Sequence, residues 1–347
     1  MNENRTSASQ GVAPACGWDT AADVAREYRA IRSGAGIRIL DDRLIVRVTG
    51  DDRDSFLHGM CTADIKALTP GAAVAALFLT EHAHVIAEVF AYAEADAILI
   101  EIERELWPHV RTHLERFIVA DDVELEELDE LAVVDFEGPG AVEVVGRIWG
   151  EVTASLEPWR YEYKREYKRR IARIPRFGQA AFTLITERSK ATATVAEMIA
   201  GGEVCALSAQ ALEIVRVENG RARVGVDTGE KTLALEARLE PAISFNKGCY
   251  VGQETIERVT ARGGLKQRLY GLRIEGRRLP ARGSAVVFEG REVDRLSSVV
   301  ASPAIGVIGL AILHHSAWSE GARVTVRDAA GEAGAVVSDL PFARPGV

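Results

Sequence analysis

The segment Lys247-Gly248-Cys249-Tyr250-Val251-Gly252-Gln253-Glu254 brings a thiol, an ammonium group, two glycines and a carboxamide–carboxylate pair together within eight residues. Gly248 and Gly252 permit positive φ angles or a close approach of the backbone to a ligand. A cysteine of ordinary pKa is only about 3% thiolate at pH 7, and Lys247 or a helix beginning at Gly252 would raise that fraction. The segment therefore predicts a reactive Cys249 or, alternatively, a buried structural cysteine in a glycine-rich turn.

The composition is that of a globular protein with two or three domains. The chain has 347 residues, of which 47% are hydrophobic and 27% are charged, and its net charge is −9. This charge argues against broad binding to nucleic acid or to anionic membranes. The longest apolar run, Ala304 to Leu313, is too short to cross a bilayer. The first residues lack the layout of a signal peptide, so a cytoplasmic location is expected.

Four cysteines lie at positions 16, 61, 205 and 249, without any C-x-x-C pair. This spacing offers neither a zinc site nor a complete iron–sulfur ligand set, so no resident metal is expected. Disulfides are not expected in a cytoplasmic chain.

All eight positions of the octapeptide 247–254 fit the signature K-G-C-[FY]-x-G-Q-E, which resembles that of the YgfZ family, folate-binding relatives of the glycine cleavage T-protein. The resemblance covers roughly residues 36 to 343. It implies an α+β, T-protein-like fold: two packed α+β subdomains and a C-terminal antiparallel β-barrel. It also implies tetrahydrofolate, or another reduced folate, as the ligand. Four further octapeptide residues are then expected at the folate site: Gly248, Gly252, Gln253 and Glu254.

A second segment, Arg216-Val217-Glu218-Asn219-Gly220, ends a predicted helix over residues 208–219 and resembles the L-R-x-E-x-G segment of T-proteins. In those relatives the glutamate binds the pterin. A carboxylate can accept hydrogen bonds from the 2-amino group and N3–H of a pterin in a fork. The resemblance therefore predicts folate held by Glu218, with Arg216 nearby. The alternative is a glutamate that caps the turn at Gly220.

A third pattern, V-T-G-x-x-x-x-x-F-L-x-x-x-x-T-x-D over Val48 to Asp64, resembles the opening of T-protein-like folate domains. By this resemblance Asp64 lies near the folate cavity, although an aspartate after a helix is ordinarily a turn residue. The predicted hairpin 73–79 and 85–92 resembles the one that carries an Asp-Asp pair in T-proteins. Ala87 and Glu88 stand at that pair here. Because alanine cannot act as an acid or base, this departure argues against aminomethyl transfer.

The rest of the chain is expected to divide into a mobile tail over 1–20, a folate-binding module over 21–264 and a barrel domain over 265–347. Glycine-punctuated short strands from Leu269 onward indicate the barrel. The basic and aromatic stretch 159–173 is interpreted as exposed strands and loops rather than as a surface for nucleic acid.

The resemblance implies a folate-binding protein that supports synthesis or repair of iron–sulfur clusters in client enzymes, including tRNA-modifying ones. Cys249 would be the reactive group and Lys247 would tune it. The alternative is a folate-dependent one-carbon transferase, for which Glu88 or Asp64 is the available carboxylate. A third alternative is an interaction module in which Cys249 only packs. The residues leave open whether the chain catalyses a defined step.

Overall fold

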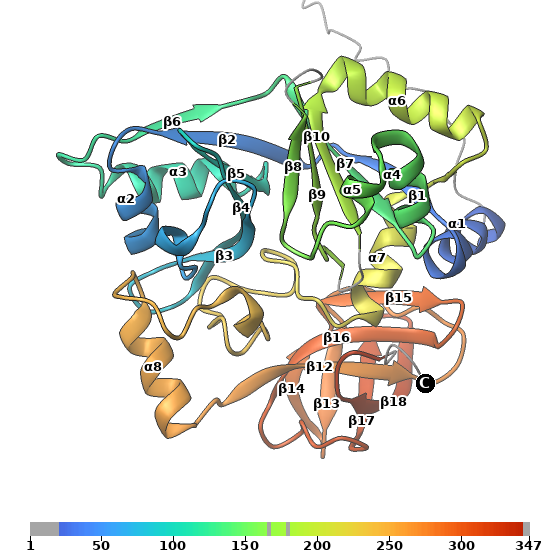
Figure 1. Cartoon of the computed structure of the whole chain (residues 1–347). Helices are drawn as coiled ribbons and strands as arrows, with labels where there is room; N and C mark the ends of the chain where they lie inside the picture. The colour runs from blue at the N-terminus through green and yellow to red at the C-terminus, as the bar shows by residue number, and fades with distance from the viewer. Residues whose placement is uncertain (1–20, 165–167, 178–180, 343–347) are drawn as a thin grey trace, which may run out of the picture.

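The computed structural model describes residues 21–164, 168–177 and 181–342, so the tail predicted for residues 1–20 lies outside the described residues. Within the described residues the strands form three sheets (Figure 1). A five-stranded and a six-stranded sheet come from the N-terminal part of the chain, and a seven-stranded sheet follows in the C-terminal part.

The five-stranded sheet is antiparallel and carries helices on one face. Its strands, in spatial order, are β3 (Ala73–Leu79), β4 (Val85–Ala93), β5 (Ile98–Glu103), β2 (Arg43–Thr49) and β6 (Glu124–Glu127). Helices α2 (Arg53–Met60) and α3 (Trp107–Glu115) share one core cluster with this sheet. Since alternate strand residues point to opposite faces, Phe90 and Tyr92 instead enter the central core between the sheets.

The six-stranded sheet has the order β11 (Cys205–Ala206), β1 (Gly36–Leu40), β7 (Leu131–Glu137), β10 (Phe182–Glu187), β9 (Arg169–Arg173) and β8 (Tyr161–Lys164). Helices α4 (Ala141–Trp149), α5 (Glu151–Ala154) and α6 (Arg188–Ala200) belong to the same half of the chain, and α4 and α6 share a core cluster with the sheet. The described residues of the basic and aromatic stretch 159–173 include β8 and β9 at one edge of this sheet, where Arg170 pairs with Glu94 at 2.5 Å.

The chain passes from one sheet to the other at Asp41-Asp42. The strands on either side of this pair belong to different sheets, because β1 pairs with β7 and β2 pairs with β5. The link between the sheets therefore crosses the middle of the molecule, and both aspartates line a cavity there.

The C-terminal sheet is an open antiparallel half-barrel. Its strands, in spatial order, are β14 (Arg291–Arg295), β13 (Ala285–Phe288), β17 (Arg323–Asp328), β18 (Gly331–Ser338), β12 (Gln267–Ile274), β16 (Gly306–His314) and β15 (Ser298–Ser302). Leu272, Val286 and Leu313 are among the buried residues of its interior. Helix α8 (Gln253–Arg262) precedes the sheet and begins within the octapeptide, after Gly252.

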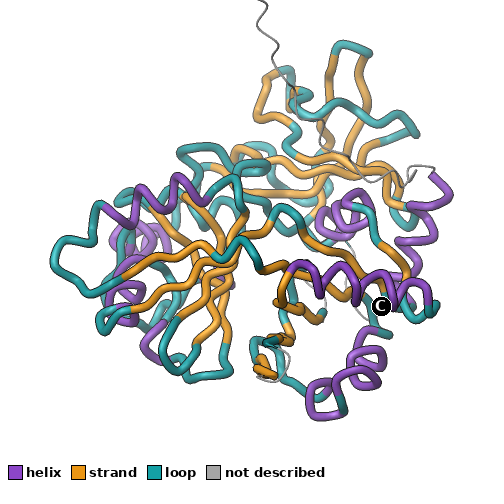
Figure 2. The backbone as a smooth tube through the Cα atoms, turned by 90° about the horizontal axis from the view of Figure 1, so that it is seen from above, coloured by secondary structure: helices purple, strands orange, loops and turns teal. Residues whose placement is uncertain are grey.

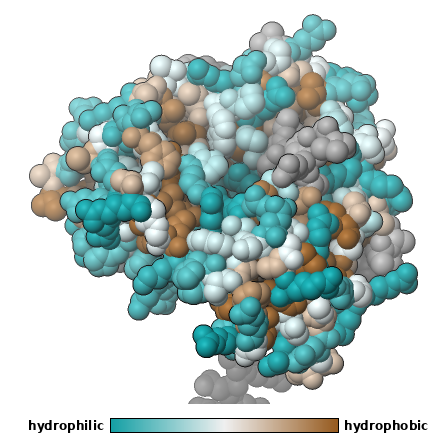
Figure 3. Space-filling view, turned by 90° about the horizontal axis from the view of Figure 1, so that it is seen from below, coloured by the Kyte–Doolittle hydropathy of each residue, from teal (hydrophilic) through white to brown (hydrophobic). Residues whose placement is uncertain are grey.

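Helix α7 (Ala209–Glu218) lies at the centre, against α1 (Ala21–Ser33) and against strands β15 and β16 of the half-barrel. Two short 3-10 helices, η1 (Ile65–Ala67) and η3 (Glu240–Ala242), lie in connecting segments. Seen from above, strands lie in the interior and also reach one edge of the molecule, and helices lie beside them (Figure 2). The face seen from below is largely hydrophilic, with separate small hydrophobic patches (Figure 3). Over the described ranges, none of the helices has the length and apolarity needed to span a bilayer.

Candidate functional site

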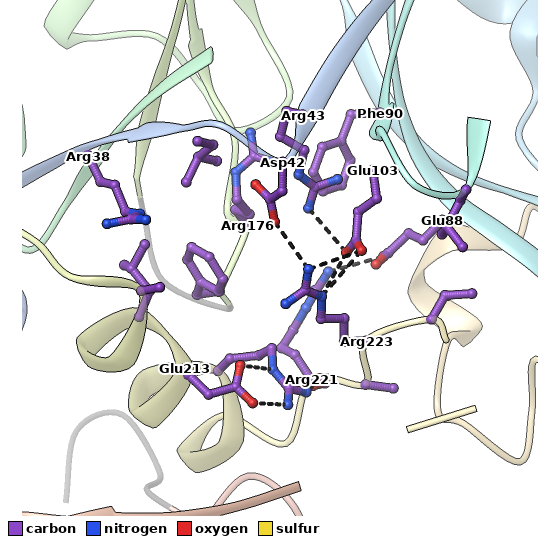
Figure 4. A pocket seen from close by; sticks show the side chains of 18 of the residues that line it. Arg38, Asp42, Arg43, Glu88, Phe90, Glu103, Arg176, Glu213, Arg221 and Arg223 are labelled. Atoms are coloured by element: carbon purple, nitrogen blue, oxygen red, sulfur yellow. Dashed lines mark hydrogen bonds and ion pairs between the residues drawn. The ribbon is translucent and has the colours of Figure 1, made fainter. Parts of the chain in front are cut away.

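A cavity of about 300 Å³ opens where the two N-terminal sheets meet α7 (Figure 4). Its wall comes from the crossing segment between β1 and β2, from β4 and β5, and from α7 with the loop that follows it. The lining residues are Arg38, Leu40, Asp41, Asp42, Arg43, Glu88, Phe90, Glu103, Leu106, Arg176, Phe177, Ala209, Leu212, Glu213, Arg216, Arg221, Ala222, Arg223 and Val224. Eleven of these nineteen residues are charged, so the wall is more polar than that of a typical small-molecule site.

Ion pairs bridge the cavity wall. Arg221 Nη2 lies 3.2 Å from Glu88 Oε1, so the loop after α7 contacts β4. Arg223 contacts Glu103 at the end of β5 at 3.2 Å and Asp42 at 3.1 Å. The Glu88 and Arg221 side chains keep about a fifth of their surface exposed.

A buried charge network forms one side of the cavity. Arg176 donates to Glu101 at 3.0 Å and to Asp135 at 3.2 Å, and its guanidinium lies 4.9 Å from the Phe90 ring centroid. Burial alone would raise the pKa of Glu101, but Arg176 and Arg43 hold it below its ordinary value. The network holds Phe90 and the adjoining surface of β4 and β5 in position at the cavity wall.

Helix α7 presents Glu213 to the cavity and anchors Arg216 behind it. Arg216 donates to both Glu213 oxygens at 2.8 and 2.6 Å, and also to Asp227 and Ser298 at 2.6 Å each. Although Arg216 was predicted as a folate contact and does line the cavity, its donors are already engaged. The Glu213 carboxylate keeps 34% of its side chain exposed and has further lone pairs with which to accept hydrogen bonds.

Glu218, the predicted pterin ligand, does not line this cavity. Its side chain is fully buried, and Tyr28 donates to it at 2.9 Å. Arg32 and Ser302 also donate to it, so its carboxylate joins α1, α7 and β15. To reach a ligand, Glu218 would have to give up these partners.

Lys247 of the octapeptide points into the C-terminal end of α2 rather than into the cavity. Its ammonium donates to the carbonyls of Cys61 and Ala63 at 2.8 Å each, and to that of His58. The last carbonyls of a helix lack partners within the helix and carry partial negative charge, which explains this attraction. Burial lowers the pKa of Lys247. The predicted role of Lys247 in tuning the thiol has no direct contact to support it.

The other octapeptide residues shape a turn in which Cys249 is exposed. Gly252 has a φ of +88°, and a Cβ there would lie 2.7 Å from the Thr80 carbonyl, so glycine is required. Gln253 accepts from the Tyr250 amide at 3.3 Å, which links the turn to the start of α8. Gly248 and Glu254 are exposed. No residue of 247–254 is among those that line the cavity.

Asp64 also lies outside the cavity wall. Its Oδ1 accepts from the Ala67 amide at 3.3 Å, as the N-cap of η1, and lies 3.3 Å from His58 Nδ1. Asp64, His58 and the octapeptide therefore gather at the end of α2, and the carboxylates of the cavity gather elsewhere. Sequence reasoning missed Glu213, Arg221 and His58 because none of them stands in a motif; only the pairing of distant segments identifies them.

Two family models match the chain. The model of the GCVT N-terminal domain matches residues 13–247, and that of the glycine cleavage T-protein C-terminal barrel domain matches residues 267–343. A chloroplastic protein of Arabidopsis thaliana, named as a candidate transferase, is 28% identical over 302 residues, which cover 86% of this chain and 68% of that protein. An aminomethyltransferase of Rubrobacter xylanophilus is 26% identical and matches 85% of this chain and 81% of its own length.

One solved structure shows the same fold. The aminomethyltransferase T of the glycine cleavage system from Bartonella henselae superposes with a TM-score of 0.83 at 18% identity, covering 92% of this chain and 89% of that one. The predicted α+β architecture with a C-terminal antiparallel barrel is therefore confirmed.

Proposed function

Because the chain belongs to the GcvT family of glycine cleavage T-protein relatives, we propose that it binds a reduced folate such as tetrahydrofolate in the cavity beside α7. The observation that carries the proposal is the cavity itself, in which Glu88 and Glu213 stand beside Phe90 and Leu212. Carboxylates can accept from the amino and ring N–H groups of a pterin, and apolar side chains can cover its ring faces.

Glu213 is the carboxylate we assign to the pterin. It lies in the wall, it is part exposed, and Arg216 already orients it. Glu218 lies about 140° away around the same helix, since five residues advance it by that angle. The two glutamates therefore cannot both face the cavity.

The folate assignment is tested by calorimetry with tetrahydrofolate. Glu213→Ala should weaken binding by roughly 2 kcal/mol, or about 30-fold, because charge-assisted hydrogen bonds are lost. Glu115→Ala, on the exposed surface of α3, serves as the control and should bind as the wild type does. Absence of binding by the wild type would refute the proposal. Normal affinity of Glu213→Ala would move the pterin to another carboxylate.

For the role of the bound folate, we propose support of iron–sulfur cluster synthesis or repair in client enzymes, with Cys249 as the reactive group. The support is the octapeptide, which resembles that of YgfZ proteins and which holds the Cys249 thiol at the surface. A client protein can reach an exposed thiol, whereas the buried Cys61 is shielded and burial raises its pKa to about 11.

One-carbon transfer is the second candidate, and the position of Glu88 favours it. Glu88 lies in the cavity wall and contacts Arg221, so a carboxylate is present where a bound folate would lie. Ala87, its neighbour, is buried and offers no acid or base. A positioned general base typically contributes about 10²–10⁴-fold to a rate.

A pair of assays separates the two candidates. Cells that lack the chain should lose activity of iron–sulfur enzymes and regain it with the wild type but not with Cys249→Ser. In the purified protein, aminomethyl transfer from a lipoyl carrier to tetrahydrofolate should be absent or marginal. Robust formation of methylene-tetrahydrofolate that disappears in Glu88→Gln would establish the second candidate instead. Full complementation by Cys249→Ser would exclude a reactive thiol.

A further inference from the structure

One arginine of the cavity wall, Arg38, has no carboxylate partner within the described residues. Each of the other arginines in the wall forms an ion pair with a carboxylate. These arginines are Arg43, Arg176, Arg216, Arg221 and Arg223. Figure 4 shows Arg38 on the other side of the view from Glu88, with no drawn interaction reaching it. The positive charge of Arg38 is therefore available to an anion that enters the cavity.

The alternation of side chains along β1 places Arg38 at the cavity. Ile37 and Ile39 pack into the core cluster that β1 shares with α4 and α6, whereas Arg38 and Leu40 line the cavity. Successive residues of a strand point to opposite faces, which explains this division. Strand β1 is paired on both sides, with β7 and with β11. The backbone from which the Arg38 side chain extends is therefore fixed at the cavity wall.

The guanidinium of Arg38 lies at the start of α7. Its Nη1 donates to the Leu207 carbonyl at 3.0 Å, and Ala209, the first residue of α7, also lines the cavity. Glu27 is the carboxylate at this end of α7, and it accepts from Ser208 rather than from Arg38. A guanidinium has five N–H donors, so a bond to one neutral carbonyl leaves donors for a ligand. A carboxylate matches such a donor pair with a bidentate fork.

Arg38 and Glu213 form two separate polar positions along α7. Glu213 follows Ala209 by four residues, or about 6 Å along the helix axis. Leu212 and Phe177 add apolar surface to the same wall. A reduced folate carries groups in a corresponding order: N–H donors on the pterin, an aromatic p-aminobenzoyl linker, and the carboxylates of glutamate at the far end. With its pterin at Glu213, a folate is long enough for its tail to reach Arg38.

We propose that Arg38 binds a carboxylate of the folate tail, and that the cavity thereby selects reduced folates over pterins without an ionised tail. This inference rests on the proposed folate site and adds the group that recognises the anionic end of the ligand. Arg38 determines specificity and takes no part in a chemical step. A tail whose carboxylates are esterified should gain nothing from Arg38, because an ester has no charge to pair with the guanidinium.

The test is calorimetry of the full chain with tetrahydrofolate and with its glutamate dimethyl ester, which keeps the length of the tail but removes its charge. The wild type should bind the acid roughly 10- to 100-fold more tightly than the ester, as expected for charge-assisted hydrogen bonds. Arg38→Met should bind the acid about as weakly as the ester. Arg38→Lys keeps the charge without the planar fork and should keep part of the preference.

Arg29→Met, at an exposed position on α1, is the matched control and should keep the full preference for the acid. Because both ligands are compared in each protein, a partly unfolded variant would lose affinity for both and keep their ratio. A folded Arg38→Met protein with the wild-type preference would overturn this inference, as would a wild type that binds acid and ester equally. In both cases the folate proposal would stand. Absence of binding of either ligand by the wild type would refute the folate proposal, and this inference with it.

Discussion

At the scale of single residues, two buried carboxyl groups are accommodated in opposite ways. Glu218 accepts hydrogen bonds from Tyr28, Arg32 and Ser302. Glu137, at the end of β7, has no hydrogen-bond partner for either oxygen within the described chain. Burial and the neighbouring Asp135 raise the pKa of Glu137 well above its ordinary value, which favours the neutral form of its carboxyl group. A buried carboxyl group needs either donors or its own proton.

We therefore expect Glu218→Ala to lower the stability of the protein. It leaves the buried hydroxyl groups of Tyr28 and Ser302 without an acceptor, and Arg32 without its carboxylate. We expect the free energy of unfolding to fall by about 3 kcal/mol, measured by urea denaturation. Glu213→Ala, on the cavity side of the same helix, should cost less, because Arg216 keeps Asp227 as a carboxylate partner. A Glu218→Ala protein with normal stability and lost folate binding would show that Glu218 is the pterin ligand after all.

At the scale of elements, local patterns predicted much of the secondary structure. The hairpin over 73–79 and 85–92, the helix predicted over 208–219 and the helix that starts after Gly252 all form. These predictions depend on local signals, namely apolar periodicity, turn residues and glycine. Strand β5 was not among the predicted strands, although it is the partner of both β2 and β4.

What local patterns could not show is which elements meet. The strands β1 and β2 look like neighbours in sequence but belong to different sheets, because each finds its partner far along the chain. Lys247 is adjacent to the thiol in sequence, yet its ammonium bonds to carbonyls 184 and 186 residues away. The octapeptide therefore indicated a relative of the glycine cleavage T-protein, as the family models show, but not the direction of its own lysine. No sequence motif marked Glu213 or His58. Their surroundings are seen only in the structure, from the positions of α7 and α2.

At the scale of the whole molecule, the cavity exists because three layers meet at α7. The helix packs against α1 on one side and against β15 and β16 of the half-barrel on another, and a central core cluster includes residues from all three sheets. A change in how the half-barrel packs against α7 should therefore also change the position of the α7 residues in the cavity wall. Arg216 is the side chain that joins these parts, since it contacts Glu213 in the wall and Ser298 in β15.

Arg216→Met tests that attachment. The substitution keeps the apolar stem but removes the donors to Glu213, Ser298 and the fully buried Asp227. Removing one partner of a buried ion pair typically costs about 3–5 kcal/mol, and we expect a loss of that size in urea denaturation. Hydrogen exchange should show reduced protection in α7 and in β15 together, because one side chain connects them.

The matched control is Arg327→Met in the same half-barrel. Arg327 pairs with Glu332 at 2.5 Å, but both side chains are more than half exposed. Surface pairs contribute about 0–1 kcal/mol, so this variant should unfold nearly as the wild type does. Comparing the stability of the two variants isolates the effect of burial, because both substitutions remove a guanidinium group. Equal stability of the two variants, or loss of protection in β15 without any change in α7, would mean that the half-barrel is held to the N-terminal sheets by apolar packing alone. In that case Arg216 would only orient Glu213, and its replacement would weaken folate binding while stability stayed intact.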